Sequence, residues 1–342
     1  MSDLNTITNQ LFDRREAMRP NARTWAKHLL LLLITFVTVT IAGVLQPFGI
    51  IEVFPKDEPQ SWNEIFQFVL SLPLRYVGLI SETIQQLYEK PHVLQYGLKL
   101  SISLLIILIC HEMGHYIACR IYGVDATLPY FIPTPPMIGP AGTFGAFIKI
   151  VSPMPSRRAV FDIGVAGPIA GFIALIPIAL IAFFTYQYDA PAPEIPGGTL
   201  VFSDPLLFKL LAAIFGVDMQ KPMIPNPFYF AAWIGLLVTA LNLIPSGQLD
   251  GGHAMFAVFN KKIHFWTGRI AFVVVAITAI SGWFLYSSPS GFLFAVLLGV
   301  MMRVKHPEPY DTTPLDFKRK VIAILTVLIF ILSVTPFPIQ IR

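Results

Sequence analysis

The sequence predicts an all-α protein that crosses a membrane about seven times and carries a small re-entrant β-hairpin. Hydrophobic residues make up 55% of the 342 residues and charged residues only 13%, whereas soluble domains carry about 25% charged residues. The apolar residues form long runs, several of which reach the roughly 20 residues that a bilayer span needs. One segment between two runs is instead rich in proline and glycine, which break helices. These three observations define the fold class.

Seven apolar segments are predicted to span the membrane, and they divide the chain into three parts. Residues 1–27 are expected to form a cytoplasmic tail, 28–93 the first span with an interfacial segment, and 94–342 the functional core with the C-terminal spans. Within the second part, residues 62–89 are interrupted by charges and read as an amphipathic helix at the membrane surface. A short surface helix is expected at 206–215. The spans are expected at about 28–50, 94–119, 159–187, 228–249, 266–287, 290–304 and 320–337.

The distribution of basic residues predicts how the protein is oriented. If the seven spans alternate, 17 of the 24 Lys and Arg residues lie on the side of the N-terminus. Cytoplasmic loops carry this excess, so the N-terminus is predicted to be cytoplasmic and the C-terminus external. No basic cluster interleaved with aromatic residues indicates a nucleic-acid partner.

Residues 121–158 are predicted to form the re-entrant β-hairpin. Five prolines lie between positions 129 and 140, and Gly142 and Gly145 precede a strand-like run at 146–151. Non-helical backbone at membrane depth survives only where it is buried in protein or lines a wet cavity. The hairpin is therefore a candidate wall of a functional site.

The strongest functional signal lies late in the second predicted span. His111 and His115 are four residues apart, so their imidazoles project from one helix face and can share a zinc ion. Glu112 lies beside the first histidine and is predicted to act as the catalytic general base, then to protonate the leaving amine. Ionisable residues inside a span are costly and usually functional. One zinc ion per chain would give all three a common partner.

A catalytic zinc ion needs a third protein ligand, and Asp250 is the best candidate. Cys119 is rejected because it lies about 12 Å from His111 along the helix axis. Asp250 closes the fourth predicted span, where Pro245 and Gly247 break the helix. The second and fourth spans run in the same direction, so Asp250 is expected at the depth of the histidines, near the cytoplasmic face. His253 is the reserve ligand.

At these residues the chain resembles the site-2 protease family of intramembrane zinc metalloproteases, in its bacterial and chloroplast branch without a PDZ insert. The family pairs H-E-x-x-H with N-x-x-P-x-x-x-L-D-G-G, which are residues 111–115 and 242–252 here. The resemblance covers about residues 90–342. His253 is a departure, because the family often has arginine at that position.

The resemblance implies roles for individual residues. His111, His115 and Asp250 would bind zinc, and Glu112 would be the catalytic acid and base. Asn242, which shares its motif with Pro245, would hold the substrate or its oxyanion. The strand near Gly142 and Gly145 would bind an unfolded substrate by strand addition, which suits a substrate whose unwound backbone needs new hydrogen bonds.

The predicted function is zinc-dependent cleavage of transmembrane segments of membrane proteins, as in regulated intramembrane proteolysis. The partners would be these substrates and the membrane lipid; the sequence indicates neither a particular substrate nor an oligomeric state. One alternative is a metal-ion transporter, which would need further acids or histidines inside other spans, and almost none occur. Another is a catalytically idle binding homologue, against which the intact Glu112 argues.

Overall fold

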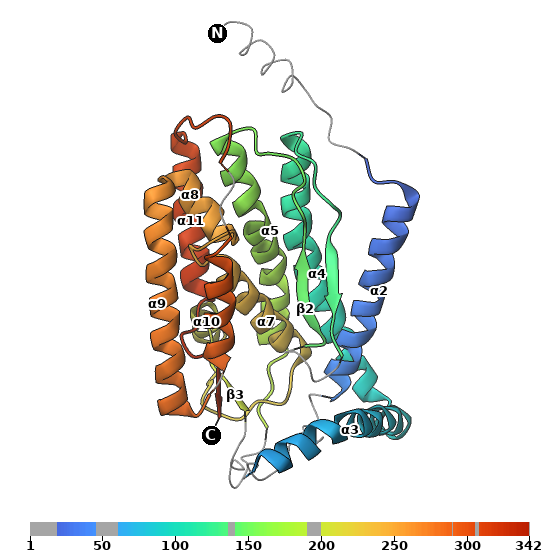
Figure 1. Cartoon of the computed structure of the whole chain (residues 1–342). Coiled ribbons are helices and arrows are strands. Elements are labelled where there is room, and N and C mark those ends of the chain that lie inside the picture. The colour runs from blue at the N-terminus through green and yellow to red at the C-terminus, as the bar shows by residue number, and fades with distance from the viewer. Residues whose placement is uncertain are drawn as a thin grey trace, which may run out of the picture.

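The computed structural model describes residues 19–45, 61–135, 141–189, 200–288, 290–304 and 308–341, and these residues are mostly helical. Long helices run side by side along one axis, and one long helix, α3, lies across their ends (Figure 1). The helices are α2 (Ala22–Leu45), α3 (Trp62–Glu89), α4 (His92–Ile121), α5 (Arg157–Phe184), α6 (Leu206–Phe215), α7 (Pro227–Asn242), α8 (Asp250–Val258), α9 (Lys261–Tyr286), α10 (Ser290–Met301) and α11 (Phe317–Ser333). The strands are β1 (Tyr130–Pro133), β2 (Thr143–Phe147), β3 (Leu200–Phe202) and β4 (Ile339–Ile341).

Each of the seven predicted spans overlaps one helix. Among the described residues, five helices are long and apolar enough to cross a membrane, namely α2, α3, α4, α5 and α9. Four of these, α2, α4, α5 and α9, match predicted spans, whereas α3 was predicted to lie at the membrane surface. The remaining three predicted spans correspond to the shorter helices α7, α10 and α11. A count of seven membrane crossings therefore stays a prediction. The last residues of the first predicted span, 46–50, lie outside the described residues.

The fourth predicted span, 228–249, extends beyond the helix that the structure shows there. The helix α7 ends at Asn242, tight turns follow, and a separate helix, α8, begins at Asp250. Pro245 has no N–H to continue a helix, and Gly247 has a φ of 55°, a left-handed conformation that glycine adopts without strain. Asp250 is therefore the first residue of a new helix instead of the end of an old one.

Polar caps fix the starts of several helices. The side chain of Ser156 accepts a hydrogen bond from the backbone N–H of Ala159 at the start of α5. Asn226 caps α7 in the same way, with Pro227 at the first helical position. Such caps satisfy backbone donors that have no partner within the helix.

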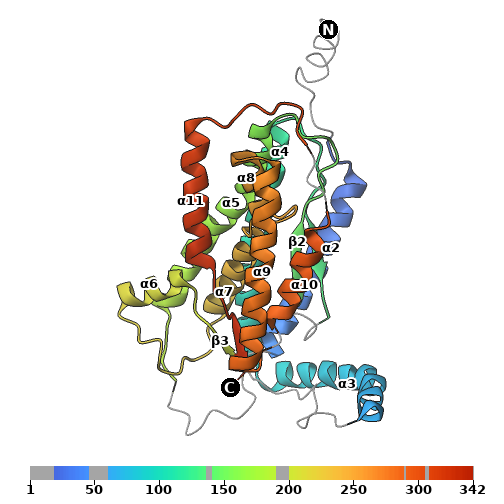
Figure 2. The same cartoon turned by 60° about the vertical axis from the view of Figure 1, so that its left-hand side comes forward.

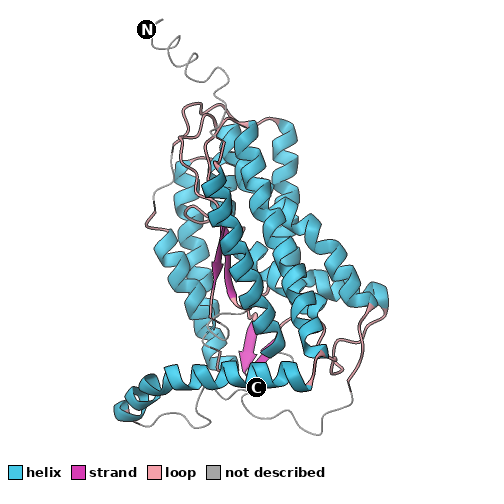
Figure 3. Ribbon diagram, turned by 90° about the vertical axis from the view of Figure 1, so that its right-hand side faces the viewer, coloured by secondary structure: helices cyan, strands magenta, loops and turns pink. Residues whose placement is uncertain are grey.

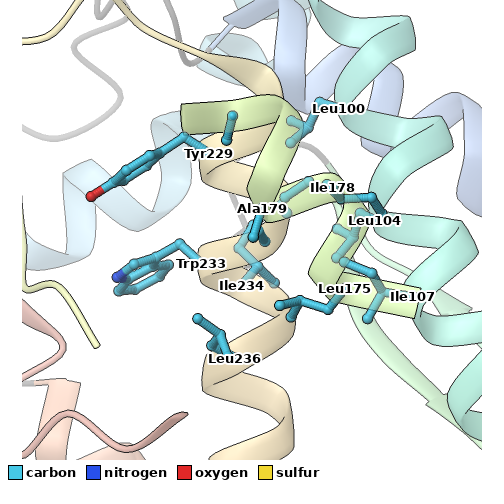
Figure 4. Packing of buried hydrophobic residues seen from close by; sticks show 14 of the residues in the cluster. Leu100, Leu104, Ile107, Leu175, Ile178, Ala179, Tyr229, Trp233, Ile234 and Leu236 are labelled. Carbon is cyan, nitrogen blue, oxygen red and sulfur yellow. The ribbon is translucent and has the colours of Figure 1, made fainter. Parts of the chain in front are cut away.

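The main core lies where α4, α5 and α7 meet (Figure 4). Because lipid is as apolar as these side chains, close packing holds such helices together, more than the burial of apolar surface. The helix α2 belongs to this packing unit, since Val39 is fully buried in the same cluster. A Cβ atom on Gly97 of α4 would lie 2.4 Å from the carbonyl oxygen of Thr40 in α2. Leu100, Leu104, Ile107, Leu175, Ile178, Ala179, Trp233, Ile234 and Leu236 form the centre of the cluster.

The predicted β-hairpin is present as β1 and β2, which pair antiparallel with Tyr130 opposite Phe147. The register shifts once, where Phe144 and Gly145 face the single residue Ile132. Gly145 has a φ of 94°, as a bulge glycine often has. Residues 136–140 of the connection lie outside the described residues. Whether the hairpin re-enters a membrane stays a prediction.

The loop after α5 contains more structure than the sequence predicts. The predicted helix at 206–215 is present as α6, but Phe208 is fully buried in the main core. The strand β3 pairs antiparallel with β4, close to the C-terminus. This second sheet joins segments more than 130 residues apart.

Candidate active site

The predicted zinc ligands come from two helices that meet at one end of the bundle. His111, Glu112 and His115 lie in the last third of α4 and are 3%, 5% and 7% exposed. Asp250 is the first residue of α8, which packs between α5 and α9 (Figure 2). The structure thus brings Asp250 next to residues that are about 140 positions earlier in the chain.

Three donor atoms form a small triangle at this point. His111 Nε2 lies 3.2 Å from Asp250 Oδ2 and 3.2 Å from His115 Nε2, and His115 Nε2 lies 3.3 Å from Asp250 Oδ2. Ligand atoms placed tetrahedrally at about 2.0–2.1 Å from zinc lie about 3.3–3.4 Å from one another. The triangle therefore fits one zinc ion and leaves its fourth position open. Among the described residues, this is the one cluster of at least three possible metal ligands.

The helix α5 holds one of the histidines in the form that binds a metal. His115 Nδ1 donates a hydrogen bond of 2.7 Å to the carbonyl oxygen of Ile163. With its proton on Nδ1, the neutral ring directs the lone pair of Nε2 at the triangle, and the carbonyl fixes this tautomer as the hydrogen-bond partners of metal-binding histidines do. The same helix leaves room for the ring at Gly167, where an added Cβ would lie 2.1 Å from His115 Nε2.

Two further polar groups point at the site. The side-chain amide nitrogen of Asn242 lies 3.2 Å from His111 Nε2. Ile148, directly after β2, lines the same cavity as Glu112, and its backbone N–H lies close enough to interact electrostatically with the carboxylate. The hairpin is therefore in contact with the residue predicted to be the general base.

A cavity of about 700 Å³ opens beside these groups. His111, Glu112, His115, Asp250 and Asn242 all line it, as do residues 146–154 of β2 and the segment that follows. Gly142, Gly145 and Pro245, which were predicted to bind substrate, are not among the described lining residues.

Gly142 has a packing role that the sequence analysis did not predict. Thr38 in α2 donates a hydrogen bond of 2.7 Å to its carbonyl oxygen. A Cβ atom at this position would lie 2.4 Å from the carbonyl oxygen of Thr38. Gly142 therefore allows the hairpin to pack closely against α2.

His253, the reserve ligand, lines the cavity but is not part of the donor triangle among the described residues. Its Cβ atom lies against Gly164 of α5, 2.7 Å from the position that a Cβ on that glycine would take. The triangle of His111, His115 and Asp250 is complete without it.

An ionic network braces the helix ends beside the site. Arg319, in the first turn of α11, contacts Asp162 of α5 with Nη2 at 2.6 Å and Tyr122 at the end of α4 with Nη2 at 3.1 Å. Tyr122 also donates to Asp162. Burial, followed by the nearby carboxylate of Asp162, raises the pKa of the Tyr122 phenol. The network links α4 and α5, which together place both histidines.

Two histidines and a carboxylate around one open position, with a glutamate beside them, define the site of a zinc-dependent hydrolase. The site lies in a bundle of long apolar helices, an arrangement that fits the class of membrane metalloproteases. The family model of peptidase family M50 matches residues 99–282, more than half of the chain. The chain belongs to this family, which confirms the resemblance to the site-2 proteases.

The chain is also similar to individual plant proteins. It is 30% identical over 238 residues to the probable zinc metalloprotease EGY2, chloroplastic, of Oryza sativa subsp. indica, covering 69% of this chain and 42% of that protein. It is 28% identical over 247 residues to the probable zinc metalloprotease EGY1, chloroplastic, of Arabidopsis thaliana, covering 70% and 43%. The chain spans less than half the length of these relatives.

Proposed function

We propose that this protein is an intramembrane endopeptidase that uses one zinc ion to cleave transmembrane segments of other membrane proteins. The observation that carries the proposal is the buried triangle of His111, His115 and Asp250 beside Glu112, open to a cavity of about 700 Å³. The names of the relatives, which are zinc metalloproteases, support the same reaction class. In regulated intramembrane proteolysis such a cut releases a soluble fragment.

Each of the polar residues around the cavity has a distinct role in the proposed reaction. Glu112 takes a proton from the attacking water and later gives one to the leaving amine. Asn242 directs its amide at the site and stabilises the negative charge that develops on the carbonyl oxygen. His111, His115 and Asp250 would hold the zinc ion, which when bound would supply a Lewis acid for activating water and polarising a carbonyl at neutral pH. The N–H of Ile148 orients the carboxylate of Glu112.

A transmembrane substrate must unwind before its backbone can be cut, because a helix hides its carbonyl groups. The freed backbone groups then need partners in a medium without water. The strand β2 and the segment after it run along the cavity, so an extended substrate segment can pair with this edge by strand addition. No described feature favours metal transport, which would need a second metal-binding cluster within the bundle.

The test of this function compares membrane proteomes of cells that contain the wild-type protein or Glu112→Gln. We expect membrane-protein fragments that appear with the wild type and vanish with the variant, because a lost general base lowers turnover by about 10²–10⁴-fold. Zinc content should stay at one ion per chain, since Glu112 is not a ligand. Glu308→Gln, an exposed glutamate paired with Lys261 at 2.5 Å, is the matched control and should cut normally. Full cleavage by Glu112→Gln would exclude the proposed base.

We also propose an orientation in which the N-terminus is cytoplasmic, the active site lies near the cytoplasmic face, and α3 lies in the plane of the opposite membrane surface. Figures 1 and 3 show α3 across the ends of the other helices. One face of α3 is apolar and exposed, at Trp62, Phe66, Val69, Leu70, Val77, Ile80 and Ile84. Its charged residues lie on the other face, as in helices that rest on a bilayer.

Cysteines on the two faces of α3 test this placement. In sealed vesicles of known orientation, Glu82→Cys should react with a membrane-impermeant maleimide from the external side, whereas Val77→Cys should be protected by lipid. The chain with its own Cys110 and Cys119 gives the background signal. If α3 crosses the bilayer, accessibility will instead depend on position along the helix, with its two ends labelled from opposite sides.

A further inference from the structure

A stack of side chains connects α2 to the wall of the cavity. His28 of α2 is 6% exposed, and its Nδ1 donates a hydrogen bond of 2.8 Å to the carbonyl oxygen of Pro129. Its ring packs on Tyr130 with centroids 4.2 Å apart. Tyr130 in turn stacks on Phe147, the opposite residue of the hairpin, with centroids 5.4 Å apart and planes at 22°.

Phe147 is the member of the stack that reaches the cavity. It lines the cavity and is 47% exposed. Its neighbours Ala146 and Ile148 pack against the two core clusters, and alternation along a strand directs Phe147 to the opposite face. The next residue, Ile148, lines the cavity together with Glu112, and its N–H interacts electrostatically with that carboxylate. Phe147 is therefore the neighbour in sequence of the residue that faces the proposed general base, and it lines the same cavity.

The ring of Tyr130, on which Phe147 stacks, is also contacted by a second residue of α2. Lys27 places its Nζ 5.0 Å from the centroid of the Tyr130 ring, a distance at which a cation is attracted to an aromatic face. Tyr130 is thus contacted by two consecutive residues of α2 and by Phe147. An aromatic side chain with stacked neighbours presents a fixed apolar surface, in contrast to a free side chain on an exposed strand.

We propose that Phe147 is a specificity-determining residue, whose ring forms the wall for an apolar substrate side chain next to the scissile bond. His28 and Tyr130 are positioning residues that fix this wall. The inference rests on the proposed endopeptidase function. It also gives α2, which lies outside the matched family region at residues 99–282, a part in selecting the substrate.

The test uses proteoliposomes that contain the full chain and single-span protein substrates taken from the Glu112-dependent fragments. Each residue near the cut is varied among Ala, Val, Leu and Phe, and the cut products are measured by mass spectrometry. We expect Phe147→Ala to shift the preference at one position towards larger side chains by about tenfold or more, the scale on which apolar pockets discriminate. Preferences at the other positions should stay unchanged.

Phe144→Ala is the matched control. Phe144 lies on the same strand and is 62% exposed, but it is not among the described residues that line the cavity. Its preference profile should equal that of the wild type. Tyr130→Leu and His28→Ala should weaken the preference at the same position and raise KM more than they lower kcat. His28→Asn, which can keep a donor to Pro129, should restore the profile.

The outcomes distinguish a role of Phe147 in substrate specificity from a role in maintaining the fold. An unchanged profile for Phe147→Ala, or the same shift for Phe144→Ala, would overturn the proposal. Zinc content is measured for every variant, and Phe147→Leu replaces Phe147→Ala if the latter loses zinc. Loss of zinc in both would show that Phe147 supports the fold and would also overturn the proposal. Failure of the underlying function is distinguishable, because wild-type cleavage would then not depend on Glu112.

Discussion

Replacing Asp250 with alanine is expected to remove zinc from the protein and with it all proteolysis. Asp250 Oδ2 lies 3.2 Å and 3.3 Å from the Nε2 atoms of the two histidines, so its loss leaves two ligands where a catalytic site needs three. Changing a residue that only hydrogen-bonds to a metal ligand costs about 10–100-fold in metal affinity, and loss of a ligand itself should cost more. Zinc per chain, measured by mass spectrometry after dialysis against a weak chelator, should fall from one to near zero.

Two controls make the result specific to the ligand set. Asp316→Ala removes another aspartate at the start of a helix, where its side chain accepts a hydrogen bond from the N–H of Arg319 and its pKa is thereby lowered. This variant should lose some stability, about 1 kcal/mol for a helix cap, and keep its zinc. His253→Ala tests the reserve ligand and should also keep zinc. Full zinc occupancy in Asp250→Ala would exclude Asp250 from the site.

The sequence was sufficient to predict a structural feature where a local pattern is compatible with one arrangement only. The four-residue spacing of His111 and His115 on a helix needs no tertiary information, because one turn of helix places both rings on one face. The position of Asp250 beside the histidines was predicted from the direction of the spans and from the resemblance, and the structure places it there. The prolines and glycines of residues 121–158 correctly predicted a non-helical hairpin, because they disfavour a helix whatever surrounds them.

Other features of the site and the fold could not be predicted, because they depend on backbone groups, on pairing between distant segments, or on space left by a missing side chain. His115 is bonded to the backbone carbonyl of Ile163, and Glu112 lies near the backbone N–H of Ile148. Backbone groups of this kind occur all along a chain, so no side chain marks these two positions in the sequence. The pairing of β3 with β4 joins two short segments from distant parts of the chain, and three-residue strands carry little periodicity. Gly167 and Gly171 are two small residues of α5 whose role depends on the histidines packed against them, which the sequence alone does not show.

Those two glycines give the second large prediction, because Gly167→Ala should disable the site although it replaces no ligand. An added Cβ would lie 2.1 Å from Nε2 of His115, 2.4 Å from its Cδ2 and 2.5 Å from its Cε1. The ring cannot yield, since its Nδ1 is fixed to the carbonyl of Ile163 and its backbone belongs to the buried helix α4. Either the ring leaves the triangle or α4 and α5 separate. We expect zinc affinity to fall by about 100-fold or more, the upper range for residues that orient a ligand.

A graded series of glycines separates this steric effect from the general cost of adding a methyl group. At Gly171 the nearest atom to an added Cβ is the Cβ of His111 at 3.1 Å, and at Gly78 of α3 no atom lies within 4 Å. Zinc affinity should therefore fall in the order Gly167→Ala, then Gly171→Ala, with no loss for Gly78→Ala, where alanine instead favours the helix. Since all three sites are helical, helix propensity alone predicts the same effect for each. Equal zinc affinities across the series would mean that α5 does not position His115 by close contact.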